Sequence, residues 1–73
     1  MARIEVKAEV TGKVWKILVP VGSRAEAGDP VMIVESMKME IPVVCEESGV
    51  VVELHVAEGD AVEDGQVVGY VET

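Results

Sequence analysis

The sequence predicts an all-β fold, a flattened barrel or sandwich made of two similar halves with four strands each. Seventeen of the 73 residues are valine, and a side chain branched at Cβ favours a pleated strand over a helix. Short apolar segments alternate with clusters of Gly, Asp, Ser and Glu that are typical of turns. No stretch keeps the helical apolar period of about 3.6 residues for long enough to predict a helix. An internal repeat completes the prediction.

The repeat appears when the chain is shifted by 37 residues, which aligns residues 3–35 with residues 40–72 without a gap and makes 12 of the 33 aligned pairs identical. Chance would give about two or three identical pairs, so the two segments are copies of one unit. One unit is too small to bury its own apolar face, and we expect the halves to interlock about a quasi-twofold axis. Residues 1–73 are thus predicted to form a single domain, with the tetrapeptide 36–39 between the halves.

The first half is expected to contain strands at residues 3–8, 13–19 and 30–35. In the first of these, RIEVKA, apolar and charged side chains alternate, as they do in a strand with one buried face. In the second, KVWKILV, the inward positions Val14 and Ile17 are three residues apart. This spacing breaks strict alternation and predicts a bulge or a strong local twist. The third, PVMIVE, follows a glycine-containing loop.

The second half repeats this order, with strands expected at residues 40–44 (EIPVV), 50–56 (VVVELHV) and 66–72 (QVVGYVE). The loop in each half carries two glycines six residues apart, which we expect to adopt positive φ or to allow close backbone approach. No GxGxxG or phosphate-binding loop pattern surrounds them, so their predicted role is structural. These residues are Gly22, Gly28, Gly59 and Gly65.

The composition argues against several classes of function. The net charge is −8 with only six basic residues, which leaves no phosphate-binding surface and argues against nucleic acid as a partner. The single cysteine, Cys45, cannot form an internal disulfide, and together with the single histidine, His55, it falls short of a zinc site. No apolar run approaches the roughly 18 residues of a membrane helix. The N-terminal segment lacks the continuous apolar region of a secretory signal, so the protein is expected in the cytoplasm.

The junction VESMKMEIP, residues 34–42, sets one lysine between two methionines in an acidic frame. Two-residue hairpins favour positive φ and usually contain Asn-Gly or Asp-Gly. At these turn positions Met-Lys would be a poor choice, with a backbone cost of about 1 to 3 kcal/mol. Such a conflict between residue type and backbone conformation is typical of functional sites. Pairing the strands around the midpoint puts Met37 and Lys38 at the centre of such a hairpin, Ser36 opposite Met39 and Glu35 opposite Glu40.

The repeat also maps Met1 onto Lys38, so the chain termini are expected at the pole opposite an exposed lysine. Three interpretations of this lysine are open: a solvated turn residue, a catalytic amine, or an amine that another enzyme acylates. A catalytic amine needs burial or a nearby cation to become nucleophilic, whereas Glu35 and Glu40 favour its charged form. No nucleophile, base or metal cluster lies at usable spacing, so we do not expect an enzyme.

The segment ESMKMEIPV resembles the attachment sequence of the biotinyl (biotin carboxyl carrier) domain family, whose hallmark is a lysine between two methionines, usually preceded by alanine and glutamate. The resemblance covers essentially the whole chain and is greatest to short bacterial biotin/lipoyl attachment proteins. It implies the barrel-sandwich hybrid fold. The chain departs from the family at Ser36, where alanine is commonest, and in residues 12–22, which leave no room for the protruding thumb loop of some carriers.

The resemblance implies a biotin carboxyl carrier protein. A biotin protein ligase would join biotin as an amide to Nζ of Lys38, forming an arm about 12 to 15 Å long. The arm would carry carboxybiotin from a biotin carboxylase to a carboxyltransferase of a biotin-dependent carboxylase, with an acyl-CoA as the expected acceptor. The domain is expected to be a monomer without a metal, a membrane partner or catalytic residues of its own. Recognition would use the hairpin residues Glu35, Ser36, Met37, Met39 and Glu40, the thioethers serving as adaptable contacts.

Two alternatives stay open at this point. A lipoyl carrier domain shares the fold and a hairpin lysine, but lipoyl hairpins usually place an acidic residue before the lysine and a small one after it. Here both neighbours are methionine, Met37 and Met39, so lipoate is the weaker cofactor candidate. The second alternative is an unmodified β-sandwich interaction module, which would leave Lys38 without an adduct.

Overall fold

The computed structural model describes residues 2–73, and every regular element in this range is a β-strand. The predicted all-β class is therefore confirmed. No helix within residues 2–73 is long and apolar enough to cross a membrane. The strands are β1 (Arg3–Lys7), β2 (Gly12–Ile17), β3 (Arg24–Ala25), β4 (Pro30–Ser36), β5 (Met39–Val44), β6 (Gly49–Leu54), β7 (Ala61–Val62) and β8 (Val67–Glu72).

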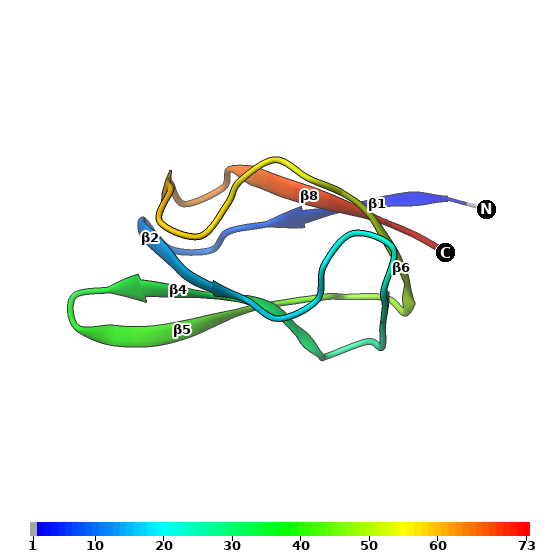
Figure 1. Cartoon of the computed structure of the whole chain (residues 1–73), viewed down its shortest axis with the longest axis horizontal. Helices are drawn as coiled ribbons and strands as arrows, with labels where there is room; N and C mark the ends of the chain where they lie inside the picture. The colour runs from blue at the N-terminus through cyan, green and yellow to red at the C-terminus, as the bar shows by residue number, and fades with distance from the viewer. Residues whose placement is uncertain (1) are drawn as a thin grey trace.

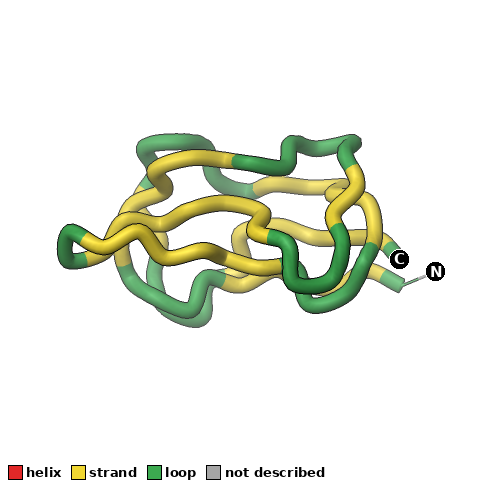
Figure 2. Tube along the Cα trace, turned by 90° about the horizontal axis from the view of Figure 1, so that it is seen from below, coloured by secondary structure: helices red, strands yellow, loops and turns green. Residues whose placement is uncertain are grey.

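The strands form two four-stranded antiparallel sheets, in the orders β1-β8-β6-β3 and β5-β4-β2-β7. We call them the β8 sheet and the β4 sheet. Each half of the chain contributes two strands to each sheet, so neither half can form a complete layer alone. Figure 1 shows β1 and β8 in one layer and β4 and β5 in the other, and Figure 2 shows the elongated molecule from below. The predicted interlocking of two four-strand halves is confirmed.

Backbone hydrogen bonds repeat with the same 37-residue offset as the sequence. The Gly22 amide donates to the Val51 carbonyl oxygen at 2.7 Å, and the Gly59 amide donates to the Val14 carbonyl oxygen at 2.7 Å. Each bond is the image of the other, which is the pattern of a quasi-twofold axis. The positive φ expected of the loop glycines is found at all four: 94° at Gly22, 89° at Gly28, 96° at Gly59 and 87° at Gly65.

The bulge predicted between Val14 and Ile17 is present. The register of β2 against β4 shifts between Val14 and Lys16, and the register of β6 against β8 shifts at the equivalent place, between Val51 and Glu53. The extra residue in each strand lets two inward side chains be separated by three positions instead of two.

The strand positions expected from the sequence omit two elements. The two-residue strands β3 and β7 lie inside the segments that the sequence identifies only as glycine loops, and they pair with β6 and β2 at the sheet edges. Two residues are too few to show an alternating pattern. Pairing with a distant strand therefore creates these elements, which no local signal marks.

The core is made of side chains from both sheets, and it follows the repeat except at one place. Met32 is fully buried, and its equivalent is Gly69. A Cβ at Gly69 would lie 2.5 Å from the Glu53 carbonyl oxygen, so the second half cannot carry a side chain there. The other buried apolar residues form six equivalent pairs: Val6 and Val43, Ala8 and Cys45, Val14 and Val51, Ala25 and Val62, Val31 and Val68, Val34 and Val71.

The two ends of the chain lie side by side at the pole opposite the β4–β5 turn (Figure 1). The Thr73 amide donates to the Ala2 carbonyl oxygen at 2.9 Å, which ties the ends together. Met1 itself, which the repeat pairs with Lys38, lies outside the described residues. The arrangement leaves the β4–β5 turn remote from both ends.

Candidate functional site

The β4–β5 hairpin has the register that the sequence predicts. Ser36 pairs with Met39 and Glu35 with Glu40, so only Met37 and Lys38 form the turn. Their φ angles are 51° and 65°, the only positive values at non-glycine residues in the described chain. Positive φ at both central positions is typical of two-residue hairpin turns, whose twist matches that of the strands. This conformation is unfavourable for residues other than glycine, asparagine and aspartate.

The turn presents its side chains to solvent. Met37 is 92% exposed and Met39 is 64% exposed, and Lys38 between them is also exposed. Exposed methionines are uncommon because burial of an apolar side chain is favourable. Their exposure on both sides of the lysine gives the turn an adaptable apolar surface around one amine.

Two carboxylates lie at the base of the hairpin. Glu35 pairs with Glu40 on β5 and with Lys13 on β2, so the three side chains form one row across the outer face of the β4 sheet. Like charges directly opposite each other destabilise a sheet, while the lysine on the other side of Glu35 offsets part of the repulsion. The row places carboxylates three residues before Lys38, at Glu35, and two residues after it, at Glu40.

Ser36 fixes the base of the hairpin through a contact that the sequence does not predict. Its Oγ donates a hydrogen bond to the Thr11 carbonyl oxygen at 2.8 Å, which links β4 to the segment before β2. Next to it, Gly12 packs against the Glu35 carbonyl group and the Val34 side chain so closely that a Cβ would overlap both. For the close approach of Gly12 to β4, the only sequence signal is that glycine recurs at the equivalent position, Gly49.

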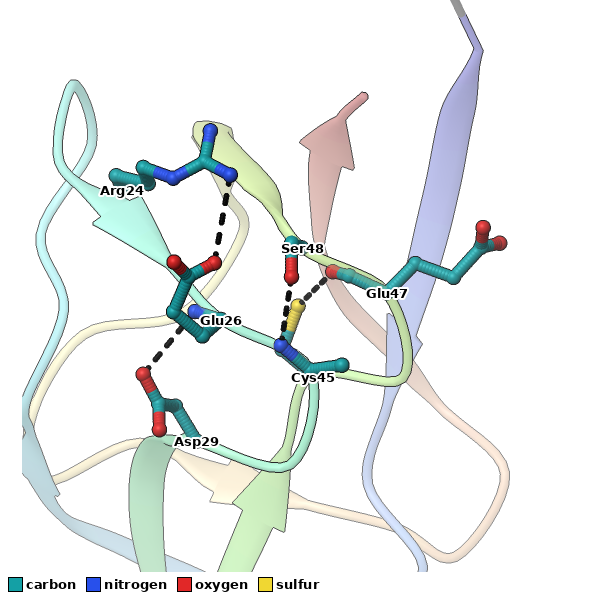
Figure 3. A network of polar contacts seen from close by, with 7 residues as sticks. Arg24, Glu26, Asp29, Cys45, Glu47 and Ser48 are labelled. Carbon is teal, nitrogen blue, oxygen red and sulfur yellow. Dashed lines mark hydrogen bonds and ion pairs between the residues drawn. The ribbon is translucent and has the colours of Figure 1, made fainter.

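A polar cluster around Cys45 has a structural role. The Cys45 thiol donates to the Glu47 carbonyl oxygen at 2.6 Å (Figure 3). Nearby, the Ala27 amide donates to Ser48 Oγ at 3.0 Å. The second contact has an image in the other half, where the Asp64 amide donates to Thr11 Oγ1 at 3.1 Å. A contact present in both halves stabilises the repeat unit itself. Within residues 2–73 no group of three His, Cys, Asp or Glu side chains is placed to hold a metal ion.

Comparison with known proteins places the hairpin in a family. The family model described as biotin-requiring enzyme matches residues 5–71. The chain is 47% identical over 62 residues to the biotin/lipoyl attachment protein of Bacillus subtilis, covering 85% of each chain. It is 40% identical over 58 residues to the biotin carboxyl carrier protein of Streptococcus mutans, covering 80% of this chain and 45% of that protein.

A solved structure extends the likeness to three dimensions. The crystal structure of the Kluyveromyces lactis urea carboxylase matches with a TM-score of 0.92 and 38% identity, over 99% of this chain and 6% of that chain. The match covers both sheets and the hairpin between them. This chain therefore belongs to the biotin/lipoyl family, the family described as biotin-requiring enzyme.

Proposed function

We propose that this chain is a biotin carboxyl carrier, which accepts biotin covalently on Lys38 and presents it to the active sites of a biotin-dependent carboxylase. One observation carries the proposal: an exposed amine at the apex of a two-residue turn, between two exposed methionines. The family description names biotin, and the similar Streptococcus protein is a biotin carboxyl carrier protein. The carrier itself performs no catalysis.

Lys38 fits a group that is joined through a carboxyl carbon. Its Nζ is a primary amine, its side chain is exposed, and none of the ion pairs among residues 2–73 involves it. The amine can therefore enter the active site of another protein without first leaving a charged partner in this one. Bound biotin supplies a ring nitrogen that takes up and releases carboxylate.

The residues of this chain present the amine. Nζ of Lys38 loses a proton, attacks an activated carboxyl carbon held by the ligase and forms an amide, while the activating group leaves. The paired strands of the hairpin position the Cα of Lys38, and the four-carbon stem of the side chain supplies reach. Met37 and Met39 offer thioether contacts that can adapt to several partner surfaces in turn. Glu35 and Glu40 attract basic residues of those partners.

The methionines on both sides of the lysine favour biotin over lipoate. The proposed partners are a biotin protein ligase, a biotin carboxylase and a carboxyltransferase, with an acyl-CoA as the proposed acceptor. A carboxylase setting is supported by the structural match to a urea carboxylase. We propose that the domain acts as a monomer in the cytoplasm.

The experiment that tests this function is co-expression of the chain with an active biotin protein ligase, followed by an avidin blot and intact-mass measurement. We expect one biotin adduct on the parent chain and none on the Lys38→Arg variant. The matched control is Lys16→Arg, an exposed lysine on β2, which should keep the full signal. A parent chain without a biotin adduct would refute the proposal, and the adduct mass separates biotin from lipoate.

A further inference from the structure

The quasi-twofold axis provides an internal comparison between the outer faces of the two sheets. Outward positions that are 37 residues apart occupy equivalent places on the two sheets, so their side chains can be compared directly. At five outward positions, the β8 sheet and its flanking residues carry mostly polar side chains: Glu5, Lys7, Val52, His55 and Tyr70. The equivalent positions on the β4 sheet are Pro42, Val44, Trp15, Leu18 and Ile33, which we call the apolar face. At a sixth pair the contrast is reversed, since exposed Val50 is equivalent to Lys13.

The apolar face is accessible to solvent. Trp15 is 51% exposed, and Leu18 and Val44 are each 43% exposed. The β8 sheet and its flanking residues show that this fold tolerates polar residues at four of the five equivalent positions; the fifth, equivalent to Trp15, is Val52. Exposed apolar side chains gathered on one sheet face are typical of an interaction surface.

The apolar face begins next to the hairpin. Ile33 pairs with Pro42 on β5 and with Lys16, the neighbour of Trp15, on β2. This row lies two residues from the row of Glu35, Glu40 and Lys13, which adjoins the turn. A hollow of about 220 Å³ beside Trp15 is lined by Lys13, Val14, Trp15, Glu35 and Gly59. A partner that binds the hairpin can therefore contact both rows.

Net charge and the length of the lysine side chain indicate which partner binds the apolar face. A second copy of this chain also has a charge of −8, and its acidic row would face the same acidic row here, so repulsion opposes self-association. A partner with basic residues around an apolar centre is complementary. Among enzymes that use Lys38, the one that acts on the bare amine must come closest, since a lysine stem spans only about 6 Å. That enzyme is the ligase.

Interface size decides which residues the ligase reaches. A standard protein interface covers about 800 Å² on each partner, a disc of roughly 16 Å radius. Ile33 is five residues from Lys38, and at about 3.3 Å per residue this is roughly the same distance. An interface centred on the turn therefore extends to the row of Trp15, Ile33 and Pro42 at its edge, and it ends before Leu18 and Val44. Tryptophan is enriched among residues that dominate binding energy.

We propose that the biotin protein ligase docks on the hairpin and on the adjoining part of the apolar face, the row of Trp15, Ile33 and Pro42, with Trp15 as its principal contact outside the hairpin. This inference rests on the proposed function, because it needs Lys38 to be the residue that the ligase modifies. It adds a recognition surface outside the hairpin. The ligase would read the folded β4 sheet together with the Met-Lys-Met turn.

The test is steady-state kinetics of biotin incorporation by purified ligase from the same organism, with the unmodified chain as the varied substrate. Trp15→Val installs the residue found at the equivalent position, Val52, so the fold has already accepted it. We expect KM for the carrier to rise at least about 10-fold and kcat to stay unchanged, because Lys38 is intact. Leu18→His, beyond the predicted interface, should change KM less than about threefold. His55→Leu on the opposite sheet is the matched control and should change neither constant.

A binding measurement on the parent chain removes any dependence on how the variants fold. The chain has one tryptophan, so its indole N–H gives a single NMR signal that should shift or broaden when the ligase is added. An unmoved indole signal beside shifted hairpin amides would overturn the docking proposal, as would a Trp15→Val variant with KM within about twofold of the parent. A parent that receives no biotin at all would instead overturn the proposed function.

Discussion

At the scale of single residues, Met37 and Lys38 hold a backbone conformation that suits neither. Both have positive φ, a region where Cβ crowds the following carbonyl oxygen and where Asn or Gly is the usual choice. Met37 is 92% exposed, so no packing energy compensates. The sequence therefore keeps a side chain that stability alone would not select, as expected for a residue that partners recognise.

The strain at Met37 can be measured. Met37→Asn should raise the free energy of unfolding by about 1 kcal/mol, because asparagine tolerates positive φ and an exposed methionine forfeits no burial. Urea denaturation followed by tryptophan fluorescence gives the value. Met39→Asn is the control, since Met39 is also exposed but has ordinary strand φ. Equal stability of the two variants would refute the account of strain.

Ser36 is the second residue whose contribution can be isolated. Ser36→Ala removes the donor to the Thr11 carbonyl oxygen and should lower the free energy of unfolding by about 1 kcal/mol. Ser36→Thr keeps a hydroxyl and should restore most of this loss. Hydrogen exchange of the β4–β5 amides should be faster in the alanine variant alone. If the threonine variant exchanges as fast as the alanine variant, the hydroxyl is not what holds the hairpin base.

At the scale of elements, the β8 sheet carries a polar cluster on its outer face that joins β1, β6 and β8. The Arg3 guanidinium lies 5.2 Å from the centre of the Tyr70 ring and pairs with the Glu53 carboxylate. His55 Nε2 lies 3.3 Å from Glu53 Oε1, and its ring meets the Tyr70 ring edge to face at 5.5 Å. The hydrogen bond from His55, followed by the charge of Arg3, lowers the pKa of Glu53 below its ordinary 4.5.

The lowered pKa makes stability depend on pH with a definite sign. A carboxyl group with a lower pKa in the folded state stabilises the fold above its unfolded pKa, and the contribution disappears as pH falls through the folded value. Between about pH 6 and pH 3 the parent should therefore lose more stability than Glu53→Gln, as measured by urea unfolding at each pH. Glu9→Gln is the control, because Glu9 joins none of the ion pairs described for residues 2–73. Identical pH profiles for parent and Glu53→Gln would contradict the cluster's role.

At the scale of the whole molecule, the core closes only when both halves are in place, and Cys45 reports on that closure. Its side chain is 2% exposed and equivalent to Ala8 in the other half. Burial raises the pKa of the Cys45 thiol, an effect that the hydrogen bond to the Glu47 carbonyl partly opposes and that nearby acidic residues, Asp29 first, reinforce. The Cys45 thiol is therefore inaccessible to solvent, and only a small fraction of it is in the reactive thiolate form.

The buried thiol predicts slow chemical labelling. In the native protein Cys45 should react with Ellman's reagent at least about 10³-fold more slowly than in urea, because a domain of about 5 kcal/mol stability exposes its core only rarely. The control is Glu46→Cys in a Cys45→Ala background, where the thiol occupies an exposed neighbouring position. Native Cys45 reacting as fast as the unfolded chain would show that the core opens without global unfolding.

Much of this architecture could be predicted from the sequence, because the strands show a local apolar alternation and the whole unit is repeated. The alternation of valines marks which strand faces are buried, and the repeat places the bulges, the four loop glycines and the junction. The hairpin register followed from the same symmetry, since pairing about the midpoint leaves only Met37 and Lys38 unpaired.

The fold class could be predicted from local alternation of valines, and the two halves and the turn lysine from the repeat, because both are patterns of residue order along the chain. The short strands β3 and β7, the replacement of a second Met32 by Gly69, the Ser36 to Thr11 contact and the apolar face beside the hairpin became visible only in the folded protein. These features join residues from different strands; Ser36 and Thr11 are 25 positions apart. Such contacts depend on how the strands twist and stack, a property of the assembled sheets that local patterns do not encode.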